Sequence, residues 1–305
     1  MPVDIQGLPG VVTALQKGGV TKTSLGLNVA ERIAAQDNEV VMIDLDHDCH
    51  LTSLLLDEET EQGVLNDDDA HIGKAMFGDV NPEDLLIETD FGIHLLPSTN
   101  LMGEVVDRMK NTTYGVNKLR HEVVVPLHEQ GYDYFLIDPP GGEGQMLDAA
   151  FAAVQRTIIP ITPEAGTVNG LARLLERTVQ PLRNEFPVDI VAITPNRMQE
   201  TISRDSSEQQ IARDLNESFR DYLPEYAKVD LEVFETIDKP GERLMEIPKP
   251  GLRKRKSIND AFKNGQPVAQ YDPECDQIEH FDTLASMVIE SCKAEQEQGE
   301  VAVHG

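Results

Sequence analysis

The sequence contains no tryptophan, and aromatic residues make up only 5% of its 305 residues. Its three cysteines, Cys49, Cys275 and Cys292, form neither a C-x-x-C pair nor a metal-binding spacing. We therefore expect free thiols in a reducing compartment. No apolar run approaches the roughly 20 residues that span a bilayer, and the N-terminus lacks the basic and apolar segments of a signal peptide. These absences predict a cytoplasmic protein that is not attached to a membrane.

Basic residues are also scarce. The chain has 26 Lys and Arg residues against 54 Asp and Glu residues, which gives a formal net charge of −28. Because 40% of the residues are hydrophobic, a packed core is still expected. An acidic, lysine-poor surface is typical of a halophilic cytoplasm, where carboxylates stay hydrated and salt screens their repulsion. An acidic protein at ordinary salt remains an alternative.

A glycine-containing loop between two apolar segments is the clearest motif. Residues 11–15 predict a strand, and residues 24–33 have apolar positions at helical spacing. The loop between them contains a glycine pair that lets backbone N–H groups approach phosphate oxygens. The start of the following helix adds its positive dipole, Lys22 adds a full charge, and the Thr23 hydroxyl is placed to bind Mg²⁺. This pattern predicts a phosphate-binding loop.

The loop resembles the deviant Walker A motif, K-G-G-x-G-K-[ST], of the ParA/MinD ATPases, with Thr21 in place of the last glycine. The resemblance implies that Lys17 is the signature lysine, which reaches the partner's nucleotide across a dimer interface. It also implies that ATP is the nucleotide. Thr21 is β-branched and narrows the backbone conformations that the loop can adopt. The predicted nucleotide contacts are Gly18, Gly19, Val20, Thr21, Lys22, Thr23 and Ser24.

A second motif follows the apolar run 39–44, which predicts a buried parallel strand. Acids at the carboxyl end of such a strand face the crevice where ligands bind. Residues 44–52 resemble the Walker A′ motif of ParA proteins, which implies that Asp46 orients the attacking water and that Asp44 supports Mg²⁺ or the loop. His47 and Asp48 replace the usual proline and glutamine. Metal binding by Asp46, His47, Asp48 and His50 is the alternative.

A third motif ends the apolar run 132–138. Asp138 is followed by two prolines, as in the Walker B segment of ParA proteins, and its carboxylate is predicted to hold Mg²⁺. Further along, Asn196 follows a predicted strand and is a candidate adenine contact by the same resemblance. A turn-forming role is an equal alternative for Asn196. Further strands are predicted at 92–98, 157–164, 188–194 and 229–234, and helices at 72–77, 117–130, 168–182, 205–219 and 276–293.

One local reversal of charge stands out against the acidic background. Arg253, Lys254, Arg255 and Lys256 are consecutive, with Lys249 and Lys263 nearby. Clustered basic side chains bind phosphates without reading base sequence, and the segment resembles the ParA region that contacts DNA non-specifically. We therefore predict DNA binding by the four consecutive residues. A basic loop neutralised by the protein's own acids is the alternative.

Together these features predict a P-loop α/β fold, with a mostly parallel twisted sheet of about seven to eight strands and helices on both faces. We expect a lead-in at 1–10, one ATPase domain at 11–293, and a disordered acidic tail at 294–305. The chain resembles the short form of ParA, without an N-terminal DNA-binding domain. The resemblance implies a Mg²⁺-dependent ATP hydrolase of low intrinsic turnover, with Lys17, Lys22 and Asp46 as catalytic residues.

The same resemblance implies a cellular role. An ATP-bound homodimer would bind non-specific DNA at the nucleoid, and a ParB-like or other adaptor would stimulate hydrolysis, so that plasmid or chromosome DNA is partitioned. A related ATPase that positions a protein cargo or the division apparatus on a non-DNA scaffold is the alternative function. A metabolic ATPase of the same superfamily, such as a ligase, is a third hypothesis, and it predicts no basic patch.

Overall fold

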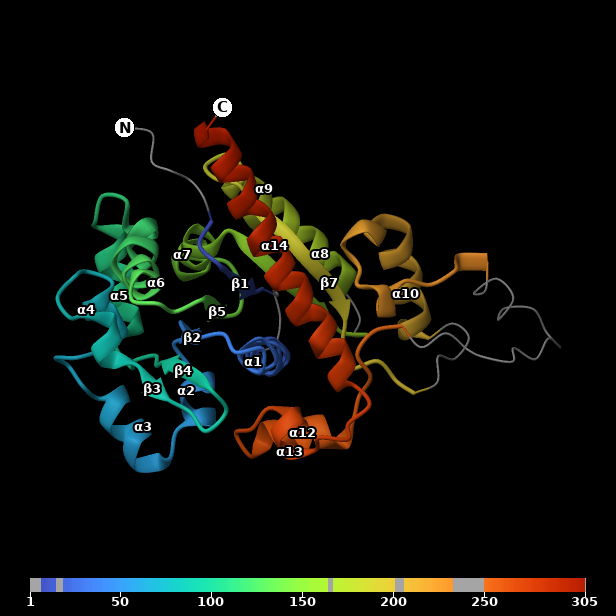
Figure 1. Ribbon diagram of the computed structural model, residues 1–305, viewed down its shortest axis with the longest axis horizontal. Helices are drawn as coiled ribbons and strands as arrows, with labels where there is room; N and C mark the ends of the chain where they lie inside the picture. The colour runs from blue at the N-terminus through green and yellow to red at the C-terminus, as the bar shows by residue number, and fades with distance from the viewer. Residues whose placement is uncertain (1–6, 15–18, 164–166, 201–205, 233–249, 305) are drawn as a thin grey trace.

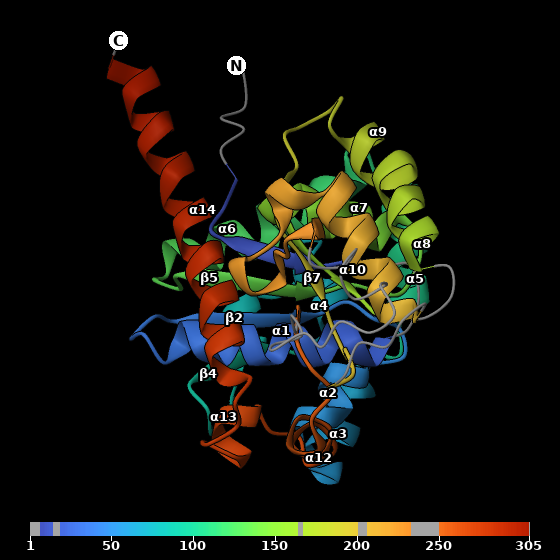
Figure 2. The ribbon, with the colours of Figure 1, turned by 90° about the vertical axis from the view of Figure 1, so that its right-hand side faces the viewer.

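A single sheet lies between two layers of helices (Figures 1 and 2). The structure is a computed structural model, and the sheet has seven strands among the residues that it describes. The predicted fold class, a mostly parallel sheet with helices on both faces, is confirmed. The described residues are 7–14, 19–163, 167–200, 206–232 and 250–304.

The strands are short apolar runs that are covered on both faces, which is why they read as continuous hydrophobic segments. Their order in the sheet is β3-β4-β2-β5-β1-β6-β7. All neighbouring pairs are parallel except β3 and β4 at one edge, which are antiparallel. The strands are β1 (Gly10–Thr13), β2 (Val40–Asp44), β3 (Ile87–Glu88), β4 (Ile93–Leu96), β5 (Tyr134–Asp138), β6 (Arg156–Ile161) and β7 (Asp189–Pro195).

One face of the sheet is covered mainly by α1 (Gly19–Ala34) and α14 (Ile278–His304), which lie against each other in both ribbon views. Their buried apolar side chains belong to one cluster with those of the sheet. Arg32 of α1 also donates from Nε to Asp282 Oδ1 of α14 at 2.7 Å. The other helices that contribute to this cluster are α2 (His50–Leu55), α12 (Lys256–Lys263) and α13 (Val268–Tyr271).

The opposite face is covered by a larger set of shorter helices around a second apolar cluster. The most central is α7 (Gln145–Val154), which is buried at eight of its ten positions. The others on this face are α4 (Ile72–Ala75), α5 (Met102–Lys110), α6 (Val125–Glu129), α8 (Thr167–Leu174), α9 (Gln180–Leu182) and α10 (Ser207–Ser218). Helix α3 (Glu58–Leu65) lies instead beside the edge of the sheet that ends in β3.

Two predicted helices are not regular α-helices along their whole length. The segment predicted at 117–130 contains a π-helical stretch, Arg120–Val124, directly before α6. The segment predicted at 168–182 contains a second one, Leu175–Val179, directly before α9. A proline stands in the first turn of both α6 and α9. Because proline has no N–H, the regular i to i−4 ladder cannot continue through it, and the turn before it widens.

The strand predicted at 229–234 is wrong over its described part. Val229 and Asp230 are in no strand, and Leu231 and Glu232 are helical. The backbone of Val229 bonds to side chains instead of a neighbouring strand: its N–H donates to Asn216 Oδ1 at 2.9 Å, and its carbonyl accepts from Arg220 Nη1 at 2.8 Å. Residues 233 and 234 lie outside the described residues.

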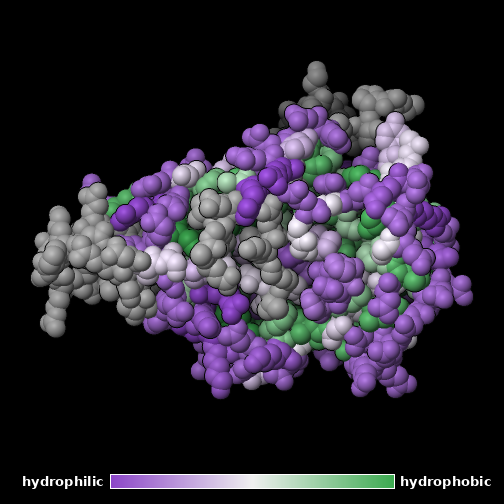
Figure 3. All heavy atoms as spheres, turned by 180° about the vertical axis from the view of Figure 1, so that it is seen from behind, coloured by the Kyte–Doolittle hydropathy of each residue, from purple (hydrophilic) through white to green (hydrophobic). Residues whose placement is uncertain are grey.

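The tail is a second correction. Residues 294–304, predicted to be disordered, continue α14 to His304. In both ribbon views the end of α14 projects past the helices beside it. No helix within the described residues is both long and apolar enough to cross a membrane. Polar side chains cover most of the face seen in Figure 3, with apolar ones in small patches between them.

Candidate nucleotide-binding site

Three adjacent strands bring the predicted site residues together. Strand β5 lies between β1 and β2, and the Cα atoms of Asp44 and Asp138 are register partners at the ends of β2 and β5. Thr13 ends β1, and its Oγ1 donates to Asp138 Oδ1 at 3.3 Å. The two carboxylates predicted from separate motifs, 94 residues apart in sequence, are therefore neighbours at the carboxyl edge of one sheet.

Helix α1 places the phosphate-loop side chains against this edge. Thr23 Oγ1 donates to Asp138 Oδ2 at 2.6 Å. Lys22 is buried, with 1% of its surface exposed, and its Nζ donates to the carbonyl of Pro139 at 2.6 Å. The helix begins at Gly19, so both side chains belong to its first turns. Lys17 and Gly18 lie outside the described residues.

Burial dominates the electrostatics of this cluster. Desolvation raises the pKa of Asp138 to about 6, against the opposing effects of the Lys22 charge and the Thr23 hydrogen bond. Desolvation and then the charge of Asp138 raise the pKa of Asp44 to about 7. The pKa of Lys22 is lowered by desolvation, although Asp138, Asp46 and Asp44 act to raise it. A bound cation would stabilise the charged form of the two buried acids, and a bound anion would stabilise the charged form of Lys22.

Asp44 holds the loop that follows β2. Its Oδ2 accepts from both the N–H and the Oγ1 of Thr52, at 2.9 and 2.7 Å. Its Oδ1 accepts from the N–H of Asp46 at 3.0 Å. Thr52 Oγ1 also accepts from the N–H of Ser98, and Ser98 Oγ donates to the Asp46 carbonyl at 2.7 Å. These hydrogen bonds are what the predicted loop-supporting role of Asp44 requires, and its support of Mg²⁺ stays a prediction.

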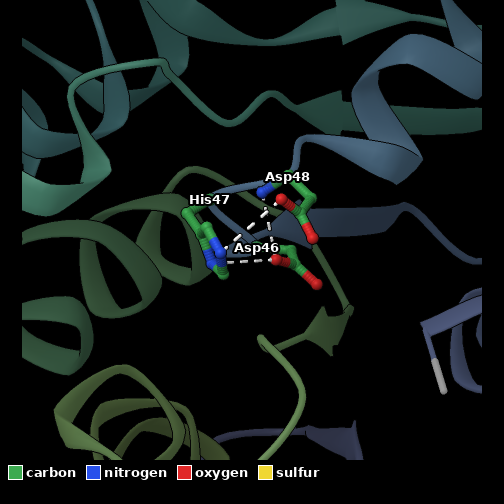
Figure 4. Close-up of side chains that lie close together, drawn as sticks. All are labelled: Asp46, His47 and Asp48. Carbon is green, nitrogen blue, oxygen red and sulfur yellow. Dashed lines mark hydrogen bonds and ion pairs between the residues drawn. The ribbon is translucent and has the colours of Figure 1, made fainter.

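Asp46 is buried at the start of that loop, and the next two residues, His47 and Asp48, are exposed (Figure 4). The Oδ1 of Asp46 accepts from the N–H of Asp48 at 3.1 Å and lies 3.2 Å from His47 Nδ1. The other ring nitrogen of His47 lies 3.5 Å from Asp48 Oδ1. Ligand atoms of these three residues are close enough to share a metal ion, whereas His50 is not part of this group. The imidazole between two carboxylates is equally well explained by ion pairing, so the metal-binding alternative stays a prediction.

A narrow pocket beside α1 contains the candidate adenine contact. It has a volume of about 40 Å³, and Asn196 and Arg197 form one wall. Thr21 and Ser24 of α1 lie on the side toward the phosphate loop. Asn196 Oδ1 accepts from the N–H of Arg197 at 2.7 Å, as expected for the turn-forming alternative. Six lining residues were missed in the sequence, because nothing local marks them as ligand contacts: Leu25 of α1, Arg197 after β7, Ile258, Asn259 and Phe262 of α12, and Phe281 of α14.

The basic segment is partly neutralised by the chain itself. Arg255 pairs with Asp276 at 2.7 Å and with Glu200 at 2.6 Å, and Arg253 pairs with Asp276 at 3.0 Å. Lys254 is exposed, and Lys256 is 91% exposed with Asp260 at 3.8 Å. Lys249 lies outside the described residues. Two of the four predicted DNA contacts, Arg253 and Arg255, are therefore paired with acids of the chain itself, as in the alternative prediction of a neutralised basic loop. DNA contact by Lys254 and Lys256 stays a prediction.

The donor set around Thr23 suits magnesium. Mg²⁺ prefers hard oxygen ligands, usually one or two carboxylates together with phosphate and water. Thr23 and Asp138 supply a hydroxyl and a carboxylate within 2.6 Å of each other at the start of the phosphate-loop helix. A separate pocket of about 510 Å³, lined by His71, Lys74 and Arg108 among others, includes none of these residues.

Comparison with known proteins agrees with this arrangement. A family model described as "AAA domain" matches residues 10–190, more than half of the chain. The chromosome-partitioning ATPase Soj of Thermus thermophilus is 33% identical over 168 residues, which cover 54% of this chain and 59%, less than two thirds, of that protein. The sporulation initiation inhibitor protein Soj of Bacillus subtilis is 25% identical over 277 residues, which cover 90% of this chain and 95% of that protein.

Two solved structures support the fold. Apo McdA from Cyanothece has a TM-score of 0.68 and 21% identity, and covers 93% of this chain and 98% of its own. A putative plasmid partition protein from Borrelia burgdorferi, bound to AMPPNP, has a TM-score of 0.68 and 17% identity, with 93% and 99% covered. The family match shows that the chain belongs to the AAA-domain family, and its curated relatives include Soj proteins.

Proposed function

We propose that this chain is a Mg²⁺-dependent ATP hydrolase that works as a switch and positions a cargo in the cell. The observation that carries the proposal is the junction of three motifs at one sheet edge: Thr23 bonded to Asp138 at 2.6 Å, the buried amine of Lys22 beside them, and Asp46 on the neighbouring loop. The solved relative that is bound to AMPPNP supports the choice of nucleotide.

Each residue has a distinct role in this proposal. The amine of Lys22 would bind β- and γ-phosphate oxygens in place of the Pro139 carbonyl that it now contacts. Thr23 and Asp138 would hold Mg²⁺, which neutralises phosphate charge when bound. Asp46 would orient the attacking water, and Asp44 would fix the loop of Asp46 through Thr52. The backbone of the loop and Ser24 would complete the phosphate contacts.

Lys17 gives the switch its dependence on a dimer. In the proposal an ATP-bound homodimer forms, Lys17 of each subunit reaches the other subunit's phosphates, and turnover is slow until the two sites align. Low intrinsic turnover follows because a monomer lacks one of the charges that stabilise the transition state.

Steady-state hydrolysis and ATP binding test these roles together. We expect Lys17→Ala and Asp46→Asn each to lower kcat by about 10²-fold or more while ATP still binds, because both residues act on the reaction rather than on the ground state. Asp48→Asn is the matched control, since Asp48 is 60% exposed and two residues further along the same loop. Unchanged turnover in Lys17→Ala would contradict the cross-dimer role, and loss of ATP binding in Asp46→Asn would contradict the water-orienting role.

For the scaffold we propose non-specific DNA, with an adaptor of the ParB type that stimulates hydrolysis. Support comes from the exposed Lys254 and Lys256, which stand in an otherwise acidic chain, and from the partition relatives. Co-sedimentation with DNA at the native salt concentration, with ATP and with ADP, tests this. We expect ATP-dependent pelleting that Lys254→Gln/Lys256→Gln lowers, because lysine contacts with phosphate release counterions.

A protein scaffold is the second candidate, favoured by one observation. Arg253 and Arg255 are engaged by Glu200 and Asp276, which removes half of the consecutive basic charge from contact with DNA. If neither nucleotide state pellets with DNA while ATP binding is intact, the DNA scaffold is refuted and a protein scaffold for cargo positioning is the remaining proposal.

A further inference from the structure

Three distant parts of the chain form the pocket beside α1. The segment after β7 supplies Asn196 and Arg197, α12 supplies one wall, and α14 supplies Phe281. Thr21 and Ser24 of the phosphate-loop helix close the remaining side. The pocket therefore lies directly next to the phosphate loop, where the base of a bound nucleotide would lie if the proposed function holds.

Backbone hydrogen bonds join two of these walls. The N–H of Leu252 donates to the Pro195 carbonyl at 2.8 Å, and the N–H of Met198 donates to the Leu252 carbonyl at 3.0 Å. The N–H of Lys254 then donates to the Met198 carbonyl at 2.8 Å. Gly251 makes the close approach feasible: its φ is +85°, and a Cβ atom there would lie 2.6 Å from the Pro195 carbonyl oxygen. The segment that leads into α12 is thus fixed along the end of β7.

Ion pairs join the third wall to the other two. Arg255 bonds Asp276 in a bidentate manner, from Nε to Oδ1 at 2.8 Å and from Nη2 to Oδ2 at 2.7 Å. Its remaining Nη1 donates to Glu200 Oε2 at 2.6 Å. Arg253 Nη2 donates to Asp276 Oδ2 at 3.0 Å, and its backbone N–H donates to Gln277 Oε1 at 2.7 Å. Asp276 and Gln277 directly precede α14, and Glu200 lies four residues beyond Asn196.

The pairing shifts the pKa values of both partners. Hydrogen bonds to Asp276, and then to Glu200, raise the pKa of Arg255 above its ordinary value despite some desolvation. The hydrogen bond from Arg255 is the largest cause that holds the pKa of Asp276 well below its usual range. Bidentate pairing of this kind is geometrically specific in a way that a lysine cannot reproduce.

We propose that Arg253 and Arg255, together with Glu200 and Asp276, form a latch that sets the width of the base pocket and thereby the affinity for the nucleotide base. This proposal rests on the proposed nucleotide binding. The four residues are positioning residues, because none of them lines the pocket. The arginines that resemble DNA contacts in the sequence thus have a second role in the fold.

The width of the pocket explains why a latch matters. At about 40 Å³ it is far below the roughly 300–1,000 Å³ of ordinary ligand sites, so its walls must separate for a base to enter. The latch spans all three walls and is not fully satisfied: Arg253 Nε is buried without a hydrogen bond in the described structure, 3.9 Å from Glu200 Oε2. A network with a spare donor can shift its pairing instead of breaking when the walls move.

Binding of two ligands separates the base pocket from the phosphate loop. We would measure the affinities of ATP and of inorganic tripolyphosphate, both with Mg²⁺, by calorimetry for wild type, Asp276→Asn and Glu200→Gln. The latch predicts that Asp276→Asn weakens ATP binding about 3- to 10-fold, since it removes the carboxylate charge and leaves one acceptor oxygen where two now accept three hydrogen bonds. Tripolyphosphate, which has no base, should bind within about twofold of wild type.

The matched control is Asp260→Asn. Asp260 lies in the same basic segment and pairs only weakly with Lys256 at 3.8 Å, outside the latch. We expect it to leave both affinities unchanged. Wild-type ATP affinity in Asp276→Asn and Glu200→Gln would overturn the latch, and so would equal loss of ATP and tripolyphosphate. If wild-type protein binds tripolyphosphate as tightly as ATP, the base adds no affinity, and the latch is refuted while phosphate binding stands. If it binds neither ligand, the proposed nucleotide function fails and the latch falls with it.

Discussion

Asp44 and Asp138 should make the ligand-free protein less stable as the pH rises. The pKa of Asp44 is raised to about 7 and that of Asp138 to about 6, both from an ordinary value of 3.8, chiefly by burial. Between about pH 4 and the raised pKa, the folded protein keeps a proton that the unfolded chain has released. The free energy of unfolding therefore falls as the pH rises through this window. Above about pH 7 the two groups no longer change it.

The size of the effect follows from the shift. At about 1.4 kcal/mol for each pH unit, Asp44 alone lowers the free energy of unfolding by on the order of 4 kcal/mol between pH 4 and pH 7. Asp44→Asn removes this titration. It also costs about 1–3 kcal/mol at low pH, because an amide cannot accept from Thr52 and from the Asp46 N–H with both of its terminal atoms. The free energy of unfolding of the variant should thus depend less on pH than that of wild type, and at pH 7.5 the variant should be as stable as wild type or more stable.

Urea unfolding at pH 5.0, 6.0 and 7.5 and fixed salt would measure these differences. Asp68→Asn is the control, because it removes one exposed acid and so corrects for the general repulsion of a chain with net charge −28. Because Asp138 contributes to the raised pKa of Asp44, Asp138→Asn should also reduce the pH dependence that Asp44 gives, and the two substitutions should not be additive. Equal pH slopes for wild type and Asp44→Asn would refute the reasoning.

Two further substitutions test how the site and its surroundings are held. Thr52→Val should lower the free energy of unfolding by about 2–4 kcal/mol, because it removes a hydrogen bond to the buried Asp44 and leaves the buried N–H of Ser98 without its acceptor. Thr52→Ser should restore most of this loss. If the Val variant is as stable as wild type in urea unfolding, the network contributes little. Gly265→Ala should destabilise the protein by about 1–3 kcal/mol, since φ is +66° and a Cβ atom would lie 2.2 Å from the Leu54 carbonyl oxygen. A Cβ atom at Gly63 in α3 meets nothing within 4 Å, so Gly63→Ala should stabilise the protein by about 0.5–1 kcal/mol. Thermal unfolding of both variants measures the difference, and a more stable Gly265→Ala than Gly63→Ala would contradict it.

The strands and the site motifs could be predicted because their signals are local. Residues 39–44 and 132–138 are apolar runs that end in an acid, and a buried parallel strand followed by a functional carboxylate has this appearance. Parallel strands end at the same edge, so the meeting of Asp44, Thr23 and Asp138 follows once the fold is known. The order of the strands does not follow from any such local signal.

The failures involve partners that are remote in sequence. Residues 229–232 have the alternation of a strand, but Asn216 and Arg220 satisfy the backbone of Val229 with side chains. Likewise, nothing near Arg255 in the sequence shows that Asp276 and Glu200, 21 and 55 residues away, will neutralise it. Charge counted along a chain cannot tell an exposed cation from one that the fold has already paired.

The register of β2 against β5 has a consequence for redesign of this chain. Asp44 and Asp138 are held opposite each other by the hydrogen bonds of the sheet, not by the loops that follow them. A slip of one residue would turn an apolar side chain toward the crevice and an acid toward the packed helices. Segments grafted between these strands should therefore leave the pairing of the two acids intact, so the connecting loops and the edges of the sheet are where new sequence can be introduced.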